Sequence, residues 1–319
     1  SRLEYPDYEV IIVDDGSTDD THEIAADYGF RVIRTPNAGL SSARNQGLAA
    51  ATGEIVAYID DDAIPDPHWL HYLATAFRNT DVAGVGGPNI PPGDDGLIAE
   101  CVSNSPGGPT HVLISDIEAE HIPGCNMAFR TDCLRAVNGF DTQFRIAGDD
   151  VDACWRIQEQ GWTLGFSPCA LVWHHYRDSV KRYWKQQFNY GAAEAMLEMK
   201  WPEKYNAAGH FTWSGRLYGR GLTEMLPLSS ARVYGGPGGS ALFQSLYRPS
   251  AGLLASLPLM PEWFLIIGIL AVLSLLGLAW EPLLWCLPLL VVAVVAPIVQ
   301  AVLSAAKAEF PKRWLLHSV

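Results

Sequence analysis

The strongest constraint on the fold is a set of three short apolar runs that alternate with helical stretches near the start of the chain. The runs are YEVIIVDD (8–15), RVIRT (31–35) and EIVAYIDDD (54–62), rich in β-branched residues and nearly continuous in apolar character. Such runs are typical of strands buried on both faces. GSTDDTHEIAADYG and GLSSARNQGLAAATG separate them and have the character of helices. This order predicts an α/β domain, with a mostly parallel sheet flanked by helices.

The third run ends in three adjacent carboxylates, Asp60, Asp61 and Asp62. Neighbouring carboxylates raise each other's pKa unless a cation neutralises them. Ligands bind at the carboxyl edge of a parallel sheet, where oxygen ligands suit a hard divalent ion such as Mg2+ or Mn2+. A D-x-D pair at this edge therefore indicates a metal that bridges the protein to a diphosphate. An acidic turn or a helix N-cap explains the same residues without a metal.

Two further polar positions belong to the same predicted edge. Asp14 and Asp15 end the first run, where carboxylates can accept hydrogen bonds from a base N–H or a ribose hydroxyl. Arg44, within NAGLSSARNQG, can face a phosphate or the base. The alternative for Arg44 is a solvated helix face.

Three more motifs follow: GCNMAFR (124–130), FRIAGDDVDACWRIQEQGW (144–162) and PCALVWHH (168–175). Together with VDDGSTDDT, NAGLSSARNQG and YIDDDAIPDPHWL, they resemble in order and spacing the family 2 glycosyltransferases, inverting enzymes with a Rossmann-like GT-A fold. The resemblance covers about residues 7 to 195. It implies transfer of a sugar from a nucleotide-diphosphate sugar to an acceptor hydroxyl, with a divalent metal, Mg2+ or Mn2+.

The resemblance also implies a role for each matching residue. Asp150 stands where the family keeps its general base, and GDDVD equally suits a helix N-terminus stabilised by acids. The implied metal ligands are Asp60, Asp62 and His174, with His175 as the second choice for the imidazole. Contacts with the nucleotide sugar are implied for Asp14, Asp15, Arg44, Asp60, Asp61, Gly124 and Asn126.

The chain departs from the family pattern at three points. The usual Glu before the base is Asp149, which is one methylene shorter, and YWKQQFNYG lacks the Q-x-x-R-W of processive synthases. The family's first strand has no counterpart, and the chain opens at SRLEYPDYEV without a Met. We therefore expect a fragment that has lost upstream sequence, with residues 1–200 as a catalytic domain without its first strand.

The last third of the chain has a different composition. Residues 201–258 are rich in Gly, Pro and Ser and read either as an interfacial segment or as an ordinary connector. Two apolar segments follow, 263–280 and 283–306, without Lys or Arg. They predict a transmembrane helical hairpin within 259–306, and the alternative is a buried hairpin in a soluble core.

Charge suggests how such a hairpin is oriented. Lys307, Lys312 and Arg313 follow it, so the positive-inside rule predicts a cytoplasmic tail at 307–319 and a cytoplasmic catalytic domain on the plasma or inner membrane. SVKRYWKQQFNYGAAEAMLEMKWPEKY (179–205) reads equally as an amphipathic helix on the membrane surface or as a domain-packing helix.

Composition excludes some other functions. The net charge of −13 argues against a nucleic-acid partner, because phosphate binding needs clustered Lys and Arg. The six cysteines form no C-x-x-C pair and predict neither a zinc site nor a disulfide framework. The sequence thus predicts a membrane-anchored glycosyltransferase acting on a glycan or lipid-linked acceptor in the cell envelope. The alternatives are a metal-dependent phosphoryl or nucleotidyl transferase and a non-catalytic membrane-bound module of the same fold.

Overall fold

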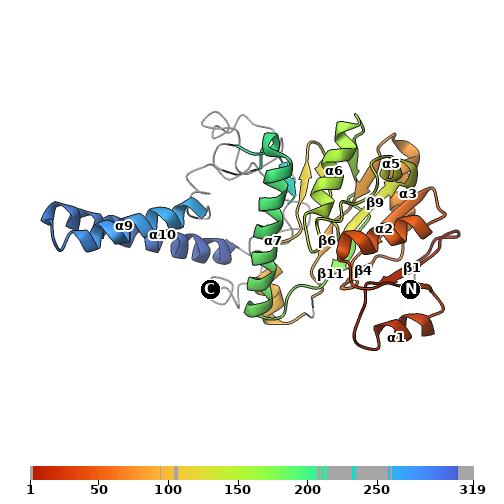
Figure 1. The fold of residues 1–319 in the computed structure, drawn as a ribbon, viewed down its shortest axis with the longest axis horizontal. Helices are drawn as coiled ribbons and strands as arrows, with labels where there is room; N and C mark the ends of the chain where they lie inside the picture. The colour runs from red at the N-terminus through yellow and green to blue at the C-terminus, as the bar shows by residue number, and fades with distance from the viewer. Residues whose placement is uncertain are drawn as a thin grey trace.

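The computed structural model describes residues 3–93, 95–103, 107–206, 209, 211–213, 232–234, 258 and 261–307. These residues form a mixed α/β domain and a pair of C-terminal apolar helices (Figure 1). The helices of the domain are α1 (Thr21–Asp27), α2 (Leu40–Ala50), α3 (Trp69–Asn79), α4 (Leu97–Ser103), α5 (Thr131–Ala136), α6 (Asp149–Glu159), α7 (Val180–Lys200) and the short η1 (Pro202–Lys204). Its strands are β1 (Ile11–Asp14), β2 (Arg31–Arg34), β3 (Ile55–Ile59), β4 (Ala63–Pro65), β5 (Gly84–Gly86), β6 (Asn89–Ile90), β7 (His111–Leu113), β8 (Glu118–His121), β9 (Asn126–Arg130), β10 (Leu164–Phe166), β11 (Val172–His174) and β12 (Arg232–Tyr234).

The first strands and helices confirm the predicted alternation. β1 and β2 pair in parallel, with Ile11 opposite Arg31 and Asp14 opposite Arg34. α1 connects them, and Gly29 turns the chain into β2 at φ 72°, a value that glycine adopts without steric cost. Among the described strands, β1 and β2 form a two-stranded sheet of their own.

The main sheet corrects the prediction of a mostly parallel arrangement. It has seven strands in the order β12-β7-β8-β10-β5-β9-β3, and only β10 and β5 run parallel. β9 runs antiparallel to both β3 and β5, and four of its five residues are buried. A strand covered on both faces shows the same continuous apolar run in either direction, so the sequence pattern does not reveal how the strands pair.

A second, three-stranded sheet in the order β4-β11-β6 lies beside the carboxyl end of β3. β11 runs antiparallel to β4, with His174 opposite Ala63 and Val172 opposite Pro65. It runs parallel to β6. This small sheet joins the acidic segment after β3 to a strand more than a hundred residues downstream.

The core is built from apolar side chains of the sheet and the helices packed on it. Leu73 on α3 and Phe129 on β9 are almost completely buried, as is Trp155 on α6. Burying such a side chain contributes roughly 1.5–3 kcal/mol. Trp155 packs against an aromatic cluster composed of Trp201, Tyr205, Phe211 and Trp213. This aromatic cluster fixes α6 against the chain that follows α7.

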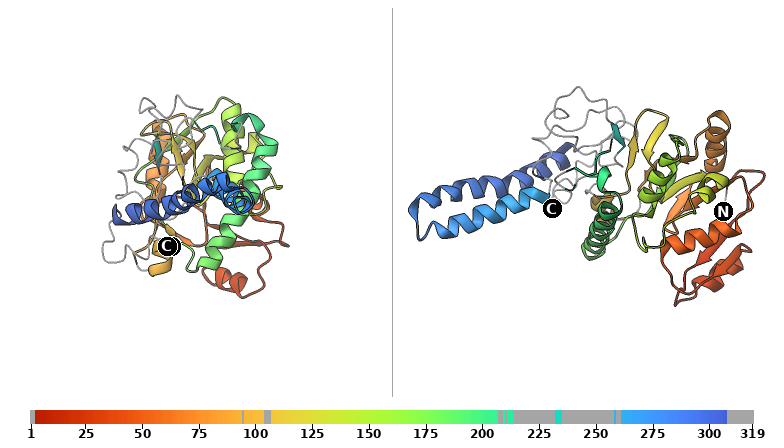
Figure 2. Two further views of the ribbon diagram at one scale, coloured as in Figure 1. Left: turned by 90° about the vertical axis from the view of Figure 1, so that its left-hand side faces the viewer. Right: turned by 45° about the horizontal axis from the view of Figure 1, so that its top comes forward.

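The C-terminal helices, α9 (Pro261–Leu276) and α10 (Cys286–Lys307), lie side by side and project away from the domain (Figure 2). The short η5 (Glu281–Trp285) joins them, and Trp263 Nε1 donates a 2.8 Å hydrogen bond to the carbonyl of Ala293. Many apolar side chains here are exposed, including Leu275 and Val292. Within the described part of the chain, this contradicts the alternative of a hairpin buried in a soluble core.

The sequence predicts two membrane-spanning helices, and only one of the described helices is long enough to span a membrane. Of the described helices, Glu281–Val299 is long and apolar enough to cross a membrane, whereas Trp263–Leu276 is apolar but shorter. Most of the predicted connector at 201–258 and nearly all of the tail at 307–319 lie outside the described residues.

Candidate active site

The small sheet brings the acidic segment to its predicted partner. Asp62 directly precedes β4, and the register of β4 with β11 places Nε2 of His174 3.2 Å from Oδ1 of Asp62. Ligand atoms of Asp60, Asp62 and His174 all lie within 4.8 Å of one another. Adjacent ligands of an octahedral ion with bonds of about 2.1 Å stand about 3 Å apart, close to the 3.2 Å between His174 and Asp62, so these side chains suit one divalent cation.

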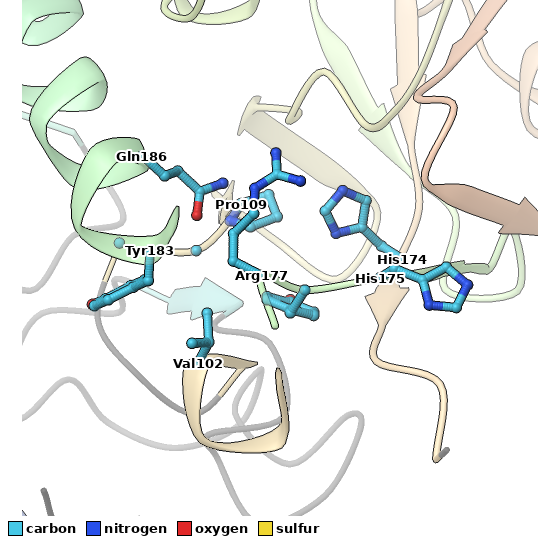
Figure 3. A pocket seen from close by; sticks show the side chains of 10 residues that line it. Val102, Pro109, His174, His175, Arg177, Tyr183 and Gln186 are labelled. Atoms are coloured by element: carbon cyan, nitrogen blue, oxygen red, sulfur yellow. The ribbon is translucent and has the colours of Figure 1, made fainter. Parts of the chain in front are cut away.

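The structure separates the two adjacent histidines, whose rings point in different directions in Figure 3. His175 contacts Oδ1 of Asp95 through Nδ1, and the other Asp95 oxygen accepts from the backbone N–H of Tyr176 at 3.3 Å. His174 instead faces Asp62. The geometry therefore favours His174 over His175 as a metal ligand.

Arg177, which the sequence analysis did not single out, lies beside this cluster (Figure 3). Its guanidinium donates to Oδ2 of Asp62 at 3.0 Å, opposite the oxygen that faces His174. Burial raises the pKa of Asp62, but the His174 and Arg177 contacts outweigh it and hold that pKa below its usual range. The sequence could have indicated this residue, because Arg177 lies only three residues after His174, the predicted metal ligand.

Arg44 is buried at the centre of the site, which contradicts the alternative of a solvated helix face. One guanidinium nitrogen donates to Oδ2 of Asp149 at 2.7 Å. The other donates to Oδ1 of Asp60 at 3.2 Å and to the carbonyl of Gly124 at 3.1 Å. Burial raises the pKa of Asp149 even though Arg44 opposes the shift. Arg44 therefore ties the D-x-D segment to the start of α6.

Asp150 lies in the first turn of α6, where the helix dipole favours a negative charge. Its Oδ2 accepts from the backbone N–H of Gly124 at 2.8 Å, and its Oδ1 accepts from Val151 N–H at 2.9 Å. Burial raises its pKa, but the nearby His121 imidazole, Arg44 and the Gly124 N–H outweigh it, so the pKa of Asp150 lies below its usual range. The carboxylate is therefore ionised at neutral pH.

Asp14 and Asp15 shape the loop between β1 and α2. Oδ1 of Asp14 accepts from the backbone N–H of Ser17 at 2.7 Å, and this bond lowers the pKa of Asp14. The two oxygens of Asp15 accept from the N–H groups of Ala38, at 2.9 Å, and Gly39, at 2.7 Å. Neither side chain lines the large cleft formed by the described residues, and their predicted base contacts stay predictions.

Gly124 and Asn126 have different surroundings, although both belong to GCNMAFR. Gly124 lines the cleft, and a Cβ at this position would lie 2.6 Å from a guanidinium nitrogen of Arg44. Asn126 is wholly buried: it accepts from Trp69 Nε1 at 2.9 Å and donates to the carbonyl of Ala170 at 2.8 Å. The expected contact between the Asn126 side chain and the sugar is therefore wrong. Asp61 is exposed to solvent.

A cleft of about 550 Å3 joins these parts. Asp60 and His174 line it with Arg177, while Asp150 and His121 line it from α6 and the end of β8. This volume falls within the usual range for small-molecule sites. The site thus combines a three-ligand cluster, a cation beside it and an ionised carboxylate held by a backbone N–H.

Comparison with known proteins shows which family the first part of the chain resembles. Residues 1–137 match the family model described as Glycosyl transferase family 2. The chain is 29% identical over 248 residues to the pre-mycofactocin glycosyltransferase of Mycobacterium tuberculosis, covering 71% of this chain and 51% of that protein. It is 27% identical over 219 residues to the poly-beta-1,6-N-acetyl-D-glucosamine synthase of Staphylococcus epidermidis, covering 63% and 51%.

Among solved structures, the mannosyltransferase PcManGT of Pyrobaculum calidifontis, in complex with GDP-Man and Mn2+, is similar with a TM-score of 0.48. That match has 20% sequence identity and covers 94% of this chain and 80% of the other. The chain spans about half the length of the two curated relatives named above.

Proposed function

Residues 1–137 carry a glycosyl transferase family 2 domain, and from this premise we propose that the protein transfers a sugar from a nucleotide-diphosphate sugar to an acceptor hydroxyl, with inversion. One observation supports the proposal above the others. A single cleft is lined by Asp60 and His174 of the three-ligand cluster and by the ionised carboxylate of Asp150. Inverting transfer needs one base for the acceptor and stabilisation of the leaving diphosphate.

Asp60, Asp62 and His174 would hold the metal, since two carboxylates and one imidazole suit Mg2+ or Mn2+. Bound there, such an ion supplies Lewis-acid stabilisation of the diphosphate. Arg177 adds a positive charge beside Asp62 and is placed to contact the same leaving group. Arg44 holds Asp60 in place through its guanidinium.

Asp150 is the proposed general base. Its Oδ2, which accepts from Gly124 N–H, lines the cleft and would take the proton of the acceptor hydroxyl. The hydroxyl oxygen then bonds to the anomeric carbon on the face opposite the diphosphate, which inverts the configuration. Asp14, Asp15 and Asp61 are retained as the proposed contacts of the nucleoside.

We place this reaction at a membrane, on the cytoplasmic side, with a lipid-linked or cell-envelope glycan as acceptor. The exposed apolar surface of α9 and α10 supports this placement, and so does α7. Val180, Trp184 and Phe188 lie four residues apart along α7, on one face of the helix, and are 68%, 73% and 75% exposed. Lys181 and Lys185 flank them, a combination suited to anionic headgroups.

The deciding experiment incubates the full chain in nanodiscs with Mn2+ and UDP-glucose, UDP-N-acetylglucosamine or GDP-mannose, using octyl β-glucoside as the acceptor. Transfer should depend on the metal, and Asp150→Asn should lower kcat by about 10²–10⁴-fold. Asp178→Asn, an exposed acid paired with Arg182 on the surface, is the matched control and should retain activity. Nucleotide release by Asp150→Asn at the wild-type rate would sink the base assignment.

The same reaction separates the alternative functions. Donor labelled with 18O at the glycosidic oxygen reports whether the C–O or the P–O bond breaks, and glycosyl transfer requires C–O cleavage. P–O cleavage would replace the proposal with phosphoryl or nucleotidyl transfer. Calorimetric binding of donor and metal without turnover of any donor would favour the non-catalytic module.

A further inference from the structure

His121 ends β8 inside the site and was not predicted from the sequence. Its side chain is 7% exposed. Nδ1 lies 3.0 Å from the carbonyl oxygen of Thr110, and the ring packs against the ring of Trp213 with centroids 5.5 Å apart. A carbonyl oxygen only accepts hydrogen bonds, so Nδ1 carries the proton in this contact. In the neutral imidazole, Nε2 therefore presents a lone pair.

That lone pair faces the active site. Nε2 has no hydrogen-bond partner within the described residues, although it is buried, and the residue lines the cleft. Oδ2 of Asp150 lies 3.7 Å away. This separation is too long for a hydrogen bond between the two groups. A buried, unpartnered nitrogen in a native structure calls for an explanation, and a ligand group is one of the few available.

We propose that His121 is a second catalytic residue, whose Nε2 binds the acceptor hydroxyl together with Oδ2 of Asp150 and receives the proton that Asp150 removes. The inference rests on the proposed glycosyl transfer and adds a group to its site. The single proton of a hydroxyl placed between two acceptor atoms 3.7 Å apart is shared by both in a three-centre hydrogen bond. The lone pairs of the hydroxyl oxygen then point away from both groups and into the cleft.

The proton and electron balance follows from this arrangement. The acceptor O–H bond breaks, and its proton passes to Oδ2 of Asp150. The two side chains then close their 3.7 Å gap to hydrogen-bond distance, and the proton moves from Oδ2 to Nε2 of His121. The freed oxygen lone pair forms the new bond to the anomeric carbon, and the bond from that carbon to the diphosphate breaks, leaving its electron pair on the diphosphate. The imidazolium pairs with the Asp150 carboxylate until it loses its proton to water.

Neighbouring groups agree with this direction of transfer. The Gly124 N–H, which donates to Oδ2 of Asp150 at 2.8 Å, and the Arg44 guanidinium both favour the ionised carboxylate, so Asp150 is a poor final resting place for the proton. His111, the other histidine close to His121, is buried, and burial lowers its pKa to about 3. His111 is thus neutral near pH 7 and does not compete for the proton.

Two substitutions test the role of Nε2 separately from the fold. His121→Asn keeps a donor near the Nδ1 position, able to bind the Thr110 carbonyl, and removes Nε2. His121→Gln places an amide near Nε2 that cannot take up a proton. His71→Gln, an exposed histidine on α3, is the matched control. Each variant is assayed as the full chain in nanodiscs with Mn2+, octyl β-glucoside and the donor that the wild type uses, alongside calorimetric donor binding and thermal unfolding.

Both His121 variants should lose about 10²–10⁴-fold in kcat, with donor affinity unchanged. Adding His121→Asn to Asp150→Asn should cost little more than Asp150→Asn alone, because groups that act as a unit are not additive. A kcat within threefold of wild type, or a loss confined to KM or to thermal stability, would overturn the assignment. An inactive wild type would instead overturn the proposed function, and this inference with it.

Discussion

Replacing Arg44 by Gln should destabilise the domain far more than an ordinary surface substitution. Arg44 donates to Asp149 at 2.7 Å, and the side chains are 8% and 1% exposed. Removing one partner of a buried ion pair costs about 3–5 kcal/mol, because the other charge stays buried without compensation. Asp60, whose side chain is 35% exposed, adds little to this cost because water replaces its contact.

This cost converts into a measurable shift. For a domain of roughly 150–250 residues, 1 kcal/mol corresponds to about 2–4 °C in Tm, so Arg44→Gln should lower Tm by about 6–20 °C. Tryptophan fluorescence follows the unfolding, since Trp155 is buried in the core on α6, the helix that also carries Asp149. Arg78→Gln, the same change at an exposed position of α3, is the control and should shift stability by less than about 0.5 kcal/mol.

A compensating substitution tests the cause. Arg44→Gln combined with Asp149→Asn removes both charges and should recover at least half of the lost Tm. If Arg44→Gln melted within about 3 °C of wild type, the buried pair would not have the strength that its geometry implies. If the double variant melted no higher than Arg44→Gln, the loss would come from packing and the electrostatic reasoning would be refuted.

Three other outcomes are expected. His174→Ala should weaken Mn2+ binding by more than about tenfold in calorimetry, whereas His175→Ala should leave it nearly unchanged; equal effects would contradict the assignment. Gly124→Ala places a methyl group 2.6 Å from Arg44 and should cost about 1–3 kcal/mol, read from Tm, while wild-type stability would show that the guanidinium moves aside. The folded pKa of Asp150 lies below its unfolded value of about 3.9, so its contribution to stability is complete above about pH 4 and is lost as pH falls towards the folded value. Wild-type Tm should therefore fall below pH 4 more steeply than that of Asp150→Asn, and parallel curves would contradict this.

The parts of the site that the sequence predicted belong to local motifs. Asp60 and Asp62 follow an apolar run, so residue type and position single them out without tertiary contacts, whereas Asp150 was singled out by the resemblance of its motif to the family. The structure brings Asp60 and Asp62 together with His174. Their roles in binding and catalysis stay proposals, because geometry alone does not measure either.

The remaining features depend on contacts between distant segments. The role of His121 comes from the approach of β8 to α6, and that of Arg177 from its contact with Asp62. Asn126 belongs to a polar motif, yet its side chain turns into the core to satisfy two carbonyl groups and Trp69. The expectation of a mostly parallel sheet was wrong because the alternation at the start of the chain says nothing about how later strands such as β9 pair.

The pairing of β4 with β11 has a consequence for how this chain can change in length. Side chains alternate between the faces of a strand, so a slip of one residue exchanges every side chain between the two sides. Inserting or deleting a single residue within β11 would turn His174 away from Asp62 and present a neighbour, Trp173 or His175, in its place. An insertion or deletion of one residue in β11 therefore removes the His174 imidazole from the metal cluster. A change in the length of the exposed turn after α1 leaves the register of β4 with β11 unchanged.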